Sequence, residues 1–142
     1  MFLRNHWYVA AWSKDVGRTP LGRVLLGESV CLFRKEDGTP IALEDRCPHR
    51  NLPLSKGKLI GDALQCGYHG LEFAHDGVCS HVPGQSEIPS WARVKSFPIV
   101  ERDLWLFVWM GDPAEADYLT VPNFHAKLSD PRWDVVTGQA YV

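Results

Sequence analysis

The chain has 142 residues, the size of one domain, with 15 Lys and Arg against 17 Asp and Glu, a formal net charge of −2. This balance provides no basic field for nucleic acid, and the longest strongly apolar run, residues 104–110, is too short to span a membrane. No signal peptide is recognisable, and the four cysteines do not suggest a secreted disulfide scaffold, so we expect a reducing, cytoplasmic location.

The first third of the chain predicts strands separated by turns. Residues 2–12 are mostly aromatic and apolar, and we expect them to cover one side of the core. Turn residues at 27–28 and 36–38 divide β-rich segments. The predicted strands are 23–26, 29–34 and 41–44, and the last of them leads directly to Cys47.

Short strands are also predicted beyond residue 55, with Gly61-Asp62 and Asp76-Gly77 as turns. The expected strands are 56–59, 63–65, 71–74, 78–81, 93–101 and 104–110. Residues 112–133 are irregular in pattern, and 134–142 return to strand character. Such a succession of short strands predicts an all-β domain of stacked antiparallel sheets with little helix.

Two short Cys/His pairs carry the chemistry of the sequence. The first is Cys47-Pro48-His49, and the second is Cys66-Gly67-Tyr68-His69. Thiolates suit iron–sulfur clusters and zinc, and two Cys plus two His are the ligands of a Rieske [2Fe–2S] centre. A Cys₂His₂ zinc site is the alternative, but its pairs are usually two Cys and two His rather than one of each.

The two pairs resemble the Rieske family pattern, Cys-x-His followed by Cys-x-x-His. The chain is most similar to the N-terminal part of Rieske non-haem iron oxygenases, in the branch of vanillate O-demethylase and dicamba monooxygenase. Further matching segments run in the family's order along nearly the whole chain. They are 7–10, 20–23, 53–55, 100–102 and 109–112.

The resemblance implies a Rieske domain over residues 1–142 with a cluster-binding part of two loops at about 45–83. The cluster ligands would be Cys47, His49, Cys66 and His69. In the family, an electron arrives from a reductase or ferredoxin. It passes to a mononuclear Fe(II) in the catalytic domain of a neighbouring subunit of a trimer. The resemblance implies that His69 hydrogen-bonds a bridging carboxylate on that neighbouring subunit.

Family subunits are more than twice as long as this chain. We therefore expect the catalytic domain to be absent here, with residues 134–142 as its first strand. The chain alone should transfer one electron without hydroxylating or demethylating a substrate. A stand-alone Rieske ferredoxin-like carrier and a zinc-stabilised interaction module are the alternative functions.

High-potential Rieske proteins have a disulfide and hydroxyl donors beside the cluster. The corresponding positions here are Leu52, Tyr68, Leu71 and Phe73, which cannot form the disulfide and largely lack donors. Fewer donors to the sulfurs stabilise the reduced state less, so we expect a midpoint potential of about −150 mV, at the low end of the family range.

Basic residues gather around the first pair: Arg46, Arg50, Lys56 and Lys58. A solvated face is the simpler interpretation of this cluster of charge. The functional alternative is docking of an acidic electron donor.

Overall fold

The structure is a computed structural model that describes residues 2–123, 130–134 and 136. The described residues form three antiparallel sheets, and their only helices are four 3₁₀ turns of three residues each, η1 (Ser13–Asp15), η2 (Leu54–Lys56), η3 (Pro113–Glu115) and η4 (Tyr118–Thr120). The predicted all-β fold of stacked antiparallel sheets is thereby confirmed. Within these residues, no helix is long and apolar enough to cross a membrane.

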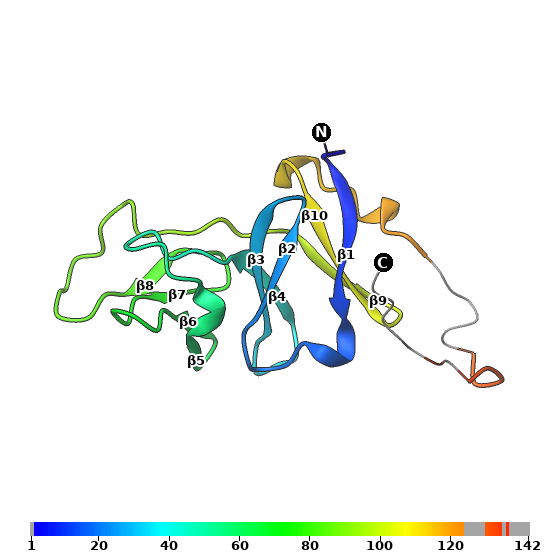
Figure 1. Ribbon diagram of the computed structural model, residues 1–142, viewed down its shortest axis with the longest axis horizontal. Coiled ribbons are helices and arrows are strands. Elements are labelled where there is room, and N and C mark those ends of the chain that lie inside the picture. Colours follow the sequence, from blue (N-terminus) through cyan, green and yellow to red (C-terminus); the bar gives the residue numbers. More distant parts are fainter. Residues whose placement is uncertain (1, 124–129, 135, 137–142) are drawn as a thin grey trace.

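Two sheets pack face to face in the middle of Figure 1. The first has the strand order β1 (His6–Trp12), β10 (Trp105–Met110) and β9 (Ile99–Arg102). The second has the order β2 (Leu21–Leu25), β3 (Glu28–Arg34) and β4 (Pro40–Glu44). Residues 2–12 were expected to cover the core, and they do so by supplying β1, which pairs with β10 around a bulge between Val9 and Ala11.

The central strand β3 is buried on both faces. Val30 and Leu32 face the first sheet, whereas Cys31 and Phe33, which alternate with them, belong to a second core on the other side. Side chains alternate between the two faces of a strand, so an uninterrupted apolar run fits a strand covered on both sides. The second sheet is therefore the middle layer of the molecule.

The third layer is a small sheet of β5 (Lys58–Ile60), β6 (Ala63–Gln65), β7 (Glu72–Phe73) and β8 (Cys79–His81). It lies at the opposite end of the molecule from β1, together with the two Cys/His segments (Figure 1). We call residues 45–94 the distal region, and residues 5–44 with 95–123 the basal region.

Several predicted strands differ from the observed ones. The predicted strand 93–101 is wrong over most of its length, because only Ile99–Arg102 is a strand; Arg93 and Ser96 form single bridges, and Pro98 has no N–H to donate. The predicted strand 23–26 ends earlier, since Leu26 is left-handed with φ 51° and forms the turn with Gly27. The predicted strand 56–59 is split between η2 and β5. Most of the predicted strand 134–142 lies outside the described residues.

Candidate iron–sulfur site

The first Cys/His loop follows β4 and is closed by its own backbone. The N–H of Cys47 donates to the carbonyl of Leu52 at 2.9 Å, and the N–H of Asn51 donates to the carbonyl of Cys47 at 2.8 Å. Asn51 is left-handed with φ 57°, a conformation that Asn tolerates better than most residues. Its side-chain oxygen also accepts a 2.8 Å hydrogen bond from Nε of Arg46.

The second loop, between β6 and β7, repeats the same hydrogen bonds. The N–H of Cys66 donates to the carbonyl of Leu71 at 2.8 Å, and the N–H of Gly70 donates to the carbonyl of Cys66 at 3.1 Å. Gly70 takes the left-handed position, with φ 76°. The two loops are thus structural repeats, although the different spacing of Cys and His conceals this in the sequence.

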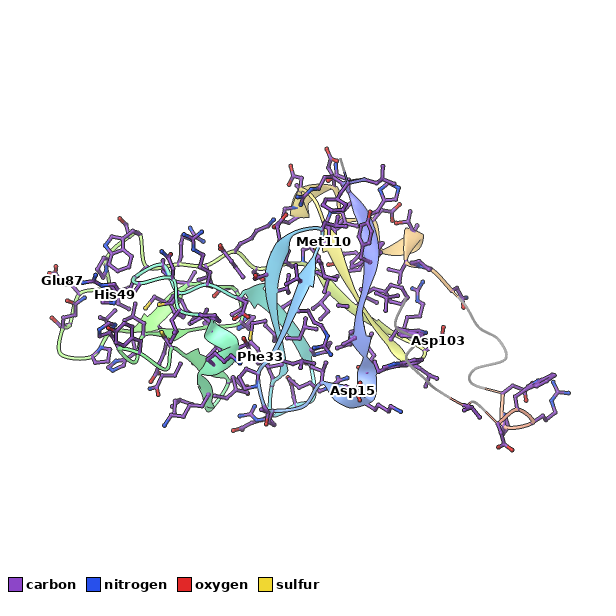
Figure 2. The ribbon with its side chains drawn as sticks, in the orientation of Figure 1. Asp15, Phe33, His49, Glu87, Asp103 and Met110 are labelled. Atoms are coloured by element: carbon purple, nitrogen blue, oxygen red, sulfur yellow. The ribbon has the colours of Figure 1, made fainter. Side chains whose placement is uncertain are left out.

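The structure brings the four predicted ligands together in two pairs of like residues. Cys47 and Cys66 are each 2% exposed, and their thiols lie within hydrogen-bonding reach of each other. The rings of His49 and His69 are exposed, with their centroids 4.5 Å apart. Figure 2 shows His49 at the far end of the distal region, away from Phe33 between the regions.

This arrangement fits the ligand chemistry of a [2Fe–2S] cluster, which needs two thiolates on one iron and two imidazoles on the other. Among the residues that the structure describes, no three His, Cys, Asp or Glu side chains are placed to hold a single metal ion. The buried sulfurs and exposed imidazoles would place one iron deep in the protein and the other near its surface.

The Cys47 thiol is held in its neutral form when no metal is bound. Burial, aided by the adjacent Cys66 thiol, raises the pKa of the Cys47 thiol to about 11, although the backbone N–H groups of His49 and Arg50 act in the opposite direction. A metal takes the thiolate as its ligand, so cluster assembly should release protons. These backbone donors to the sulfur were not predicted, because the sequence shows side chains but not N–H directions.

A buried carboxylate fastens the base of the first loop. Asp45, which is 8% exposed, accepts hydrogen bonds from the backbone N–H and the hydroxyl of Ser55, each at 2.6 Å. Gly22 lies against this pair, where a Cβ would be 2.8 Å from the Ser55 hydroxyl oxygen. The Asp45–Ser55 pair therefore joins the two ends of the loop, and it was not predicted from the sequence.

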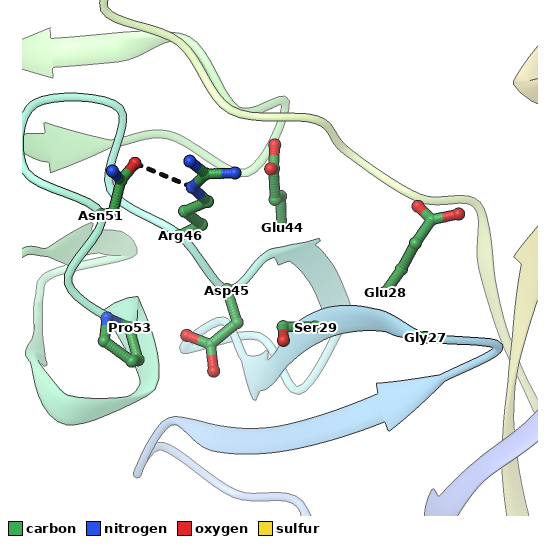
Figure 3. Close-up of a pocket in the computed structure, with 8 residues that line it drawn as sticks. All are labelled: Gly27, Glu28, Ser29, Glu44, Asp45, Arg46, Asn51 and Pro53. Carbon is green, nitrogen blue, oxygen red and sulfur yellow. Dashed lines mark hydrogen bonds between the residues drawn. The ribbon is translucent and has the colours of Figure 1, made fainter.

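Beside this pair lies a cavity of about 380 Å³ between the basal and distal regions. Figure 3 shows Glu28 and Glu44 on one side of it, and the hydrogen bond from Arg46 to Asn51 on the other. Glu28 is held by Arg4 and Lys95, whose hydrogen bonds lower the pKa of its carboxyl against the opposing effect of burial. The cavity therefore lies at the junction of the basal and distal regions, next to the Asp45–Ser55 pair that supports the first Cys/His loop.

Two aromatic side chains flank the exposed imidazoles. Tyr68, which is 63% exposed, lies over His69 with its ring centroid 3.9 Å away, and Trp91, which is 52% exposed, lies 6.2 Å from His49. Trp91 was not predicted as a site residue, because it is 25 positions from the second Cys along the chain. Its position in a loop rich in Pro, Gly and Ser was the one available signal.

The other two cysteines lie away from the surface. Cys31 in β3 and Cys79 in β8 are buried, as predicted for strand residues, and burial raises the pKa of both thiols. All four cysteines are free thiols.

An all-β domain that presents one Cys and one His on each of two matching loops has the architecture of a Rieske-type iron–sulfur domain. Residues 6–98 match the family model of the Rieske [2Fe–2S] domain. The chain belongs to this family.

Its relatives include oxygenase components. The chain is 46% identical over 142 residues to the oxygenase component of dicamba O-demethylase from Stenotrophomonas maltophilia, covering 99% of this chain and 42% of that protein. It is 38% identical over 134 residues to the vanillate O-demethylase oxygenase subunit from a Pseudomonas species, covering 94% of this chain and 37% of that protein.

A solved structure of one such oxygenase has the same fold as this chain. The crystal structure of dicamba monooxygenase bound to dicamba superposes with a TM-score of 0.90 at 46% identity, over 96% of this chain and 44% of that one. The chain thus spans less than half the length of these relatives.

Proposed function

We propose that this chain carries one electron at a time through a Rieske [2Fe–2S] cluster held by Cys47, Cys66, His49 and His69. The observation that carries the proposal is the pairing of buried thiol with buried thiol and exposed imidazole with exposed imidazole. When bound, the cluster supplies a site that accepts and releases one electron without breaking a bond to the protein.

The protein's own residues set the route and its surroundings. The thiols keep one end of the site away from water, and the backbone N–H groups of His49 and Arg50 stabilise negative charge on the Cys47 sulfur. The imidazole edges of His49 and His69 reach solvent, so a redox partner can approach them closely. Tyr68 and Trp91 cover the flanks of the two rings.

We further propose that the chain serves an oxygenase that hydroxylates or O-demethylates an aromatic compound, in a reducing cytoplasm. A reductase or ferredoxin would donate the electron, and a mononuclear iron in a catalytic domain, in a neighbouring subunit of a trimer, would accept it. The similarity to the oxygenase components of dicamba and vanillate O-demethylases supports this context. Residues 45–83 would form the cluster-binding part, and residues 134–142 would lead into the catalytic domain.

The test is a visible absorption spectrum of the purified protein, followed by EPR before and after reduction with dithionite. We expect a brown protein whose EPR signal appears only on reduction, with the low average g value of a His-ligated [2Fe–2S] site. A colourless protein with one zinc per chain would instead assign the four residues to a structural zinc site.

A further inference from the structure

A groove lined by cations runs along the distal region to the second Cys/His loop. It consists of two adjoining cavities of about 350 and 310 Å³ that share Gly57 and Lys58. Lys56 and Cys66 line the first cavity, and Arg18 lines the second. Neither cavity has an Asp or Glu among its lining residues. The groove is therefore a positively charged path that ends beside a predicted cluster ligand.

The two lysines of the groove are available for a partner. Both are exposed, and neither has an ion pair or side-chain hydrogen bond to any residue that the structure describes. Arg18, at the far end, already binds Asp62 at 2.8 Å. The unpaired charge is thus concentrated in the part of the groove closest to Cys66.

Close backbone contacts leave the floor of the groove without side chains. A Cβ on Gly57 would lie 1.9 Å from the carbonyl oxygen of Gln65, and one on Gly67 would lie 3.1 Å from that of Lys56. Because both positions are glycine, neither adds a side chain to the groove between the lysines and Cys66. A docked protein surface could approach the sulfur end of the site here, whereas the exposed imidazoles belong to His69, further along the second loop, and to His49 on the first loop.

We propose that this groove receives the carboxylate-bearing surface of the protein that donates the electron, so that the electron enters beside Cys66 and leaves through the imidazoles. The inference rests on the proposed function and adds the entry face and the chemistry of the donor to it. Two unpaired ammonium groups without a neighbouring lining carboxylate complement an acidic surface and accelerate its encounter at low salt. Separate faces would let donor and acceptor bind without competing.

The test is stopped-flow reduction of the cluster-loaded chain by a reduced plant-type [2Fe–2S] ferredoxin, chosen as an acidic one-electron donor. In the double variant Lys56→Glu and Lys58→Glu, we expect the second-order rate at low ionic strength to fall about tenfold or more, and the difference to shrink as salt is added. Titration calorimetry with oxidised ferredoxin should show the same loss of affinity without any electron transfer.

The matched control reverses two exposed cations outside the groove, Lys14→Glu and Arg93→Glu, and should change the rate by no more than about twofold. Equal slowing in both double variants, or in Arg50→Glu beside the imidazoles, would contradict the groove as the entry face. Stronger inhibition by phosphate than by chloride at equal ionic strength would assign the groove to a small anion instead.

Two further results separate this inference from the proposed function. A wild-type chain without [2Fe–2S] absorption refutes the proposed function itself, whereas an intact cluster and an unchanged rate refute only the groove. If the glutamate variant does not fold, the double variant Lys56→Gln with Lys58→Gln takes its place. Its rate at low ionic strength should be lower than that of the wild type, but by less than the tenfold expected for charge reversal.

Discussion

The basal region pairs strands of up to seven residues, whereas the strands of the distal region have two or three. Aromatic packing reinforces the basal sheets, as in the stacked rings of Trp12 and Trp105, 3.5 Å apart. The core that fills the distal region instead includes all four cysteines, two of which are predicted cluster ligands. A region with so few ladder hydrogen bonds needs another source of stability, and the four metal–ligand bonds of a cluster would provide it. We therefore expect the distal region to depend on the cluster for its stability and the basal region to be stable without it.

The strongest way to break this comparison is to remove a ligand. We expect Cys66→Ser to abolish the [2Fe–2S] absorption completely and to remove most of the amide-exchange protection of β5–β8, while β1, β3 and β10 keep theirs. The control is Cys79→Ala, which deletes a buried thiol of the same core and should keep the cluster. Loss of protection throughout the molecule would show that the two regions do not differ in this way.

Matched core truncations test the comparison next. Leu64 in β6 and Leu106 in β10 are both fully buried, so replacing either by Ala should cost about 2–5 kcal/mol of unfolding free energy in the cluster-loaded protein. Only Leu64→Ala should also accelerate the loss of the cluster, because Leu64 packs in the core that contains Cys47 and Cys66. Denaturant titrations and the decay of visible absorption measure the two effects. Equally fast cluster loss in both variants would contradict the conclusion that the cluster depends on the distal core alone.

The two loops offer a finer test within the distal region. Gly70→Ala should cost about 1–2 kcal/mol, because Ala is strained at φ 76° and its Cβ would lie 3.1 Å from Pro83. Asn51→Gly keeps the backbone relaxed and should cost about 1 kcal/mol or less, through loss of the hydrogen bond from Arg46. Thermal unfolding of the loaded protein measures both. A larger cost for Asn51→Gly would mean that the side-chain bond matters more than the left-handed backbone.

The same two regions differ in how far the sequence predicts them. In the basal region, alternating and continuous apolar segments locate most strands to within one or two residues. Alternation indicates a strand buried on one face, and a continuous apolar run indicates a strand buried on both faces. In the distal region, the four candidate ligands are identifiable from residue type and spacing. Three other features of the site cannot be identified in this way, because each depends on how separate segments meet in space. They are the Asp45–Ser55 pair, the backbone donors to Cys47 and the aromatic neighbour Trp91. Residues 93–98 fail for the same reason, since their single bridges replace a regular ladder.

The smallest effect concerns an ion pair of the basal region. Glu101 binds Arg34 at 2.8 Å and also accepts a hydrogen bond from Ser13, and these bonds, the one from Arg34 first, lower the pKa of its carboxyl. Because the pKa is lower in the folded state, the bond stabilises the protein above the pKa of the unfolded chain, and this contribution is lost as the pH falls through the folded value.

Glu101→Gln should therefore lower the unfolding free energy by less than about 1 kcal/mol at pH 7, since the side chain is partly exposed and the pair is screened by water. The difference from the wild type should begin to shrink below the ordinary pKa of Glu, about pH 4, and should disappear once the pH is below the lowered pKa of the folded state. Denaturant titrations across pH 3–7 measure this difference in unfolding free energy. The control is Glu87→Gln in the distal region, because Glu87 is exposed and has no bonding partner among the described residues. A difference that does not shrink at all between pH 7 and pH 3 would mean that Gln disturbs the packing around Arg34 rather than an ionic bond, and the basal region would then owe nothing measurable to this charge.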